Sequence, residues 1–121
     1  MKQALIALSL VCIILTNCTY ENEEEFMEQH KSCDPVNVSY TNDVLPIITS
    51  RCYSCHDREN KTGGVDLEGY DQLKKYASKG DLVGVITHAS GYPPMPAGGS
   101  KLSKCNIQTI QKWIDEGTLN N

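Results

Sequence analysis

The stretch RCYSCHDRENKTGG, residues 51–64, places two cysteines and a histidine within the five positions from Cys52 to His56. Such a cluster can hold a metal ion, form a redox disulfide or attach a haem. Which of these uses applies depends on the remaining cysteines of the chain. The chain has 121 residues and six cysteines, and its length suffices for one small domain.

The N-terminal residues have the pattern of an export signal. Lys2 precedes an apolar run over residues 4–15 that is broken by one serine. Because twelve residues are too few to cross a bilayer as a helix, the run predicts the apolar part of a secretory signal. Residues 15–18, LTNC, resemble the lipobox of bacterial lipoproteins, in which the signal is cut before an acylated cysteine. We therefore expect a signal peptide over 1–17 and a lipid on Cys18. An ordinary signal peptide cut nearby and an uncleaved anchor are the alternatives.

The distribution of charged residues indicates a tether followed by a folded domain. Residues 19–34 contain six acidic residues and one lysine, whereas residues 35–121 contain nine acidic and nine basic residues. A segment this charged and this poor in apolar groups does not fold alone. We expect an acidic tether over 18–36 and a folded domain over 37–121. The protein is expected to be exported and lipid-anchored to a bacterial membrane, facing the periplasm or the cell surface.

The cysteine count predicts one disulfide. Exported proteins meet an oxidising compartment, where unused thiols tend to pair. One cysteine leaves with the signal and a second is the expected lipid acceptor. If one cofactor takes Cys52 and Cys55, then Cys33 and Cys105 remain, and we expect a bridge between them. The alternatives are that both stay free, or that one pairs with a cysteine of the cluster.

The domain has helical periodicity and no sustained strand-like alternation. Apolar residues recur on one face in four segments, 44–52, 70–77, 82–89 and 107–114. Asn42 or Asp43 is the expected cap of the first helix, and Ser103 and Gly117 are expected to bound the last one. Prolines and glycines exclude a regular element over 91–99. The expected class is all-α, with three to five helices.

The Cys-x-x-Cys-His motif has the spacing that attaches a c-type haem. Two thiols one helical turn apart can add to the two vinyl groups on one porphyrin edge, and the adjacent imidazole can bind the iron. We expect one haem c, with Cys52 and Cys55 as its covalent links and His56 as the proximal iron ligand. One alternative is a zinc site completed by Cys33 and Cys105. The other, a thioredoxin-like dithiol, needs a β-α-β context that the pattern does not predict.

Met95 is the expected distal ligand of the iron. It lies in the proline-rich loop, and a methionine opposite a histidine raises the reduction potential of a haem. His88 is the chief rival ligand, and an open or water-bound position is a further alternative. Met27 and His30 lie in the tether and are not expected to bind iron.

Three stretches together resemble the small c-type cytochrome domains of the planctomycete and Bacteroidetes kind, within the class I cytochrome c superfamily. They are SYTNDVLPIITSRCYSCH (39–56), GGVDLEGYDQL (63–73) and PPMPAGGSKLSKCNIQTIQKWIDEG (93–117). The resemblance covers about residues 38–118 and implies a class I cytochrome c-like fold around one covalently bound haem. It implies the haem-binding residues named above, with Met95 distal, and a crossing of the helices that hold Ile47 and Trp113. The Cys33–Cys105 bridge is not a general feature of that family.

These expectations lead to a function. An iron with both axial positions filled has no place for a substrate, and no nucleophile, acid–base pair or phosphate loop accompanies it. We expect a protein that is not an enzyme but a membrane-tethered, monomeric carrier of single electrons between redox proteins, with no nucleic-acid partner. The alternative is a c-type haem sensor whose sixth ligand leaves, so that carbon monoxide or nitric oxide binds.

Overall fold

The computed structural model describes residues 33–121. The expected signal peptide, the lipid acceptor Cys18 and residues 19–32 of the expected tether lie outside the described residues. Residues 33–121 contain helices, turns and no strand, which confirms the all-α class for this range. Within the same range, no helix is both long and apolar enough to cross a membrane.

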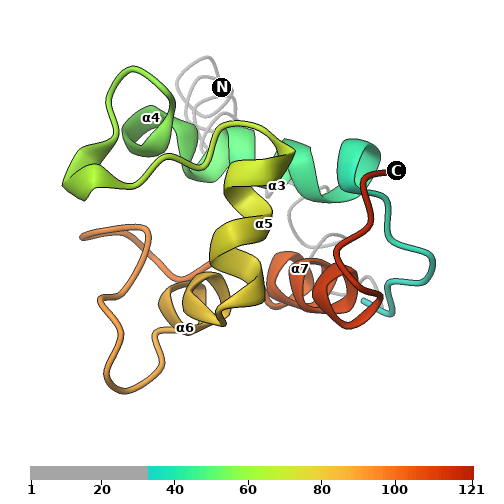
Figure 1. The fold of residues 1–121 in the computed structure, drawn as a ribbon. Coiled ribbons are helices and arrows are strands. Elements are labelled where there is room, and N and C mark those ends of the chain that lie inside the picture. Colours follow the sequence, from blue (N-terminus) through green and yellow to red (C-terminus); the bar gives the residue numbers. More distant parts are fainter. Residues whose placement is uncertain (1–32) are drawn as a thin grey trace, which may run out of the picture. The chain divides into compact units, whose positions relative to one another are not determined.

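Five α-helices and two short helical turns make up the described chain (Figure 1). In order they are the π-helical turn η1 (Tyr40–Val44), α3 (Leu45–Arg51), α4 (Tyr53–His56), the 3-10 turn η2 (Thr62–Gly64), α5 (Tyr70–Ser78), α6 (Asp81–Ile86) and α7 (Lys104–Asp115). The periodic segments 70–77, 82–89 and 107–114 correspond to α5, α6 and α7. The expected first helix is divided at Cys52, whose φ of −124° separates α3 from α4.

The first helical segment begins earlier than the sequence predicts. Ser39 has an extended backbone, and its hydroxyl accepts a hydrogen bond from the Asn42 N–H at 3.2 Å. The Asp43 carboxylate in turn accepts the Ser39 N–H at 2.8 Å. The prediction that Asn42 or Asp43 caps this helix is therefore wrong, because both lie inside the turn that Ser39 caps.

Three aromatic rings form the centre of the core. Trp113 is fully buried on α7, and the rings of Tyr40 and Tyr70 lie 5.8 and 6.5 Å from it between centroids. The indole N–H of Trp113 donates to the Leu119 carbonyl at 2.8 Å. The Tyr70 hydroxyl donates to the Thr118 carbonyl at the same distance. The polar atoms of the buried Trp113 and the partly buried Tyr70 therefore both have hydrogen-bond partners.

The C-terminus closes the domain against its first turn. Gly117, with φ of +93°, ends α7 as predicted, and the Thr118 N–H bonds back to the Trp113 carbonyl at 2.9 Å. Asn121 then takes three hydrogen bonds from the other end of the domain. They come from the Ser39 hydroxyl, the Tyr40 N–H and the Thr41 N–H, at 2.9 to 3.0 Å.

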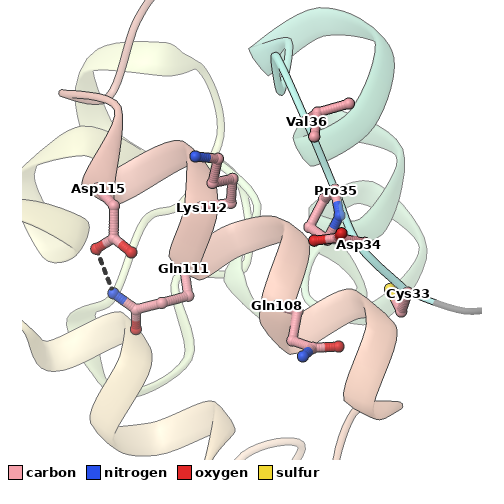
Figure 2. A pocket seen from close by; sticks show the side chains of 8 residues that line it. All are labelled: Cys33, Asp34, Pro35, Val36, Gln108, Gln111, Lys112 and Asp115. Carbon is pink, nitrogen blue, oxygen red and sulfur yellow. Dashed lines mark hydrogen bonds between the residues drawn. The ribbon is translucent and has the colours of Figure 1, made fainter.

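Cys33 and Cys105 form a disulfide, with their Cα atoms 5.3 Å apart. The bridge joins the entry of the domain to the first turn of α7, and the compact unit accordingly begins at Cys33. A shallow groove of about 300 Å³ lies between residues 33–36 and α7. Figure 2 shows the α7 side of this groove, where the Gln111 amide donates to Asp115 at 2.8 Å. The groove includes none of the expected haem-binding residues.

Candidate functional site

The Cys-x-x-Cys-His motif occupies one helical turn. The carbonyl of Cys52 accepts hydrogen bonds from the N–H groups of Cys55 at 3.2 Å and His56 at 2.9 Å. The Cys52 N–H itself donates at 2.9 Å to the carbonyl of Ile48, which is fully buried on α3. The core therefore anchors the turn that carries the two thiols and the imidazole.

The two thiols have different surroundings. Cys52 is partly buried and packs against the core, whereas Cys55 is exposed. Burial raises the pKa of the Cys52 thiol to about 11, with the nearby Arg51 charge acting in the opposite direction. A thiol held neutral in this way is a poor nucleophile.

His56 is oriented by the loop that follows it. Its Nδ1 lies 3.4 Å from the Val65 carbonyl, and its own carbonyl accepts the Leu67 N–H at 2.8 Å. A carbonyl only accepts hydrogen bonds, so a hydrogen bond here needs the proton on Nδ1, and the Nε2 lone pair is then free. Histidine ligands of metals are commonly fixed in this manner.

The loop after the motif is shaped by local interactions. The Asp57 carboxylate accepts the Asn60 N–H at 2.7 Å and the Glu59 N–H at 3.2 Å. Gly63 and Gly64 then take positive φ angles, 66° and 75°, which glycine adopts without steric cost. The chain thereby returns so that Val65 reaches the His56 ring.

Met95 lies in the loop between α6 and α7, and this loop is attached to α6. The Met95 N–H donates to the Val85 carbonyl at 3.0 Å, and the Met95 carbonyl lies 3.0 Å from the His88 Nε2. Earlier in the loop, the Tyr92 ring covers Gly84 so closely that a Cβ there would meet it at 2.5 Å. In Figure 1 this orange loop and the green loop after α4 extend to the same side of α5.

The motif and the Met95 loop carry the donor types that a c-type haem uses. Cys52 and Cys55 supply thiols one turn apart, His56 offers a free Nε2, and Met95 supplies a thioether on a fixed loop. The elements that carry these groups also keep apolar side chains only partly buried against the core. They include Ile47, Val65 and Val85.

The zinc alternative loses two of its expected ligands. The zinc interpretation needed Cys33 and Cys105, which are bonded to each other. Among residues 33–121, no group of three or more His, Cys, Asp or Glu side chains is placed to hold a metal ion. His88, the rival axial ligand, has its Nε2 engaged with the Met95 carbonyl, and its Nδ1 is the ring nitrogen left for an iron.

The attachments of the Met95 loop were not predicted. The His88 ring and the Val85 carbonyl bind backbone atoms of Met95, and such contacts leave no mark on residue types. Gly84 is the one signal that could have been used. A glycine inside a helix costs about 1 kcal/mol relative to alanine, so it often marks a close approach of another group, here the Tyr92 ring.

Comparisons of the chain with protein-family models, with curated proteins and with solved structures find no match. The resemblance to small c-type cytochrome domains therefore stays a prediction from the motifs. The proposed function therefore depends on the residues and contacts described above.

Proposed function

We propose that residues 33–121 form a monohaem c-type cytochrome domain that carries single electrons between redox proteins. The observation that carries the proposal is the anchored turn of Cys52, Cys55 and His56, in which the His56 Nδ1 faces a carbonyl and its Nε2 stays free. When bound, the haem would supply a reversible one-electron change at its iron. The proposed protein is a monomer held on a bacterial membrane by a lipid on Cys18.

His56 would act as the proximal iron ligand, and its hydrogen bond would set the orientation of its ring. The bond from Nδ1–H to the Val65 carbonyl, at 3.4 Å, fixes the tautomer and the plane of the ring. It also makes Nε2 a stronger donor of electrons. The thiols of Cys52 and Cys55 would supply the covalent attachment, one from a partly buried and one from an exposed position.

Met95 would act as the distal ligand. Its N–H and its carbonyl are both held at 3.0 Å, by the Val85 carbonyl and the His88 ring. A ligand presented by a backbone fixed on both sides needs little rearrangement when the iron changes oxidation state. This supports an electron carrier over a sensor, because a sensor needs a sixth ligand that leaves easily.

The variant Met95→Ala tests the proposal in the exported, haem-loaded full chain. We expect the variant to have a lower reduction potential, since the thioether no longer raises it, and to bind carbon monoxide in the ferrous state. The wild-type ferrous protein is expected not to bind carbon monoxide. Met27→Ala is the matched control, because Met27 is the other methionine beyond the expected signal peptide.

Two results would count against this account. An unchanged potential in Met95→Ala would exclude Met95 as the ligand. Carbon monoxide binding by the wild-type protein would favour the sensor alternative.

A further inference from the structure

His88 lies where the chain leaves α6 and turns toward the Met95 loop. Its φ is +55°, a left-handed conformation that a residue with a side chain adopts rarely. Its N–H lies 3.3 Å from the Val85 carbonyl, which also accepts the Met95 N–H at 3.0 Å. Its ring Nε2 lies 3.0 Å from the Met95 carbonyl. Since that carbonyl only accepts, the proton of the His88 ring is on Nε2.

The His88 ring supplies a hydrogen-bond donor to a segment that has few backbone N–H groups. Residues 93–96 read Pro-Pro-Met-Pro, and proline has no N–H. Met95 therefore has the only backbone donor in this segment, and it is used on Val85. Any further attachment of the segment has to reach a carbonyl from elsewhere. The His88 ring provides that attachment, at the residue whose thioether is the proposed ligand.

We propose that His88 is the positioning residue for Met95. Its Nε2–H holds the Met95 carbonyl, so that both polar groups of the Met95 backbone are fixed to the end of α6 and the thioether keeps its place. His88 acts through Met95 and does not bind iron itself. This inference rests on the proposed function, because it assigns a role within the same site.

Variants of His88 in the exported, haem-loaded full chain test the inference. His88→Leu removes the donor, whereas His88→Gln retains an amide that can donate to the same carbonyl. Cyanide competes with Met95 for the ferric iron, so its apparent affinity measures how firmly the thioether is held. The loss of one hydrogen bond in His88→Leu should raise that affinity about two- to tenfold. His88→Gln should restore much of the difference.

Thr87→Val is the matched control. The Thr87 hydroxyl donates to the carbonyls of Val83 at 2.7 Å and Gly84 at 3.3 Å, at the same end of α6 but without contact to Met95. This control loses a side-chain hydrogen bond and should keep the cyanide affinity of the wild type. An equal rise in Thr87→Val and His88→Leu would show general loosening of α6 and would overturn the inference.

A haem-independent measurement separates this inference from the proposed function. The ¹⁵N shifts of the His88 ring should report the Nε2–H tautomer, and the Nδ1–H tautomer would overturn the inference even if haem is bound. An unchanged cyanide affinity in His88→Leu would overturn it as well. Loss of the low-spin spectrum in His88→Leu, with retention in Met95→Ala, would make His88 the ligand. A wild-type protein without haem would instead refute the proposed function.

Discussion

Replacing Gly84 with alanine is predicted to push the Met95 loop away from α6. The added methyl carbon would lie 2.5 Å from Cδ1 and 2.6 Å from Cε1 and Cγ of Tyr92. Carbon atoms in contact normally lie about 3.5 to 4.0 Å apart, so the ring has to retreat by about 1 Å. Because Cγ is the ring atom next to the backbone, rotation of the ring about its own axis does not relieve the clash.

The expected cost follows from two opposing terms. Overpacking costs about 1–3 kcal/mol when a neighbouring group has to move, and here that group is the exposed Tyr92 ring. Gly84 is not among the glycines with positive φ and lies inside α6, so alanine recovers about 1 kcal/mol of helix propensity. We expect the free energy of unfolding to fall by about 0–2 kcal/mol.

A double-mutant cycle isolates the clash. In a Tyr92→Ala background the ring is gone, and Gly84→Ala should stabilise the protein by about 1 kcal/mol. The coupling between the two sites should therefore be about 1–3 kcal/mol, measured by denaturant unfolding of the haem-loaded protein. The same change of unfolding free energy in both backgrounds would refute the argument.

Three further outcomes follow from the cysteines. Changing Cys33 and Cys105 to serine should lower the free energy of unfolding by about 4 kcal/mol, because the bridge spans 72 residues. A loss below about 1 kcal/mol in urea would contradict this. In the haem-free folded domain, iodoacetamide at pH 8 should modify Cys55 before Cys52. Burial raises the pKa of Cys52 to about 11, leaving about one thiolate in a thousand at that pH. Equal rates in peptide mass mapping of the folded form would contradict the argument. Because the folded state favours the neutral Cys52 thiol, the stability of the haem-free domain should be full below about pH 8.5 and fall as the pH rises toward about 11.

Local signals predicted the ends of α7 well. Ser103 caps that helix by accepting the Asn106 N–H at 3.2 Å, and Gly117 ends it. Both interactions join residues a few positions apart, so residue types are enough to find them. The start of the first helical segment was missed because Ser39, Asn42 and Asp43 are all good caps by type. Ser39 also binds Asn121, at the far end of the domain, and no local pattern reports that contact.

The candidate site also has one part that the sequence predicts and one part that only the structure shows. The motif can be recognised from the sequence, because Cys52, Cys55 and His56 lie on one turn and their spacing determines their arrangement. The contacts that orient the proposed ligands involve backbone carbonyls: the Val65 carbonyl faces the His56 ring, and the Met95 carbonyl contacts the His88 ring. Every residue has a carbonyl, so only the folded loops show which one is used.

The most direct test of the central claim is the optical spectrum of the exported full chain, recorded before and after denaturation. The account predicts a haem spectrum that stays with the polypeptide in denaturant, because Cys52 and Cys55 hold it covalently. In the ferric native state it also predicts the weak long-wavelength band of sulfur-to-iron ligation from Met95. A colourless protein, or one that carries zinc in place of iron, would contradict the account.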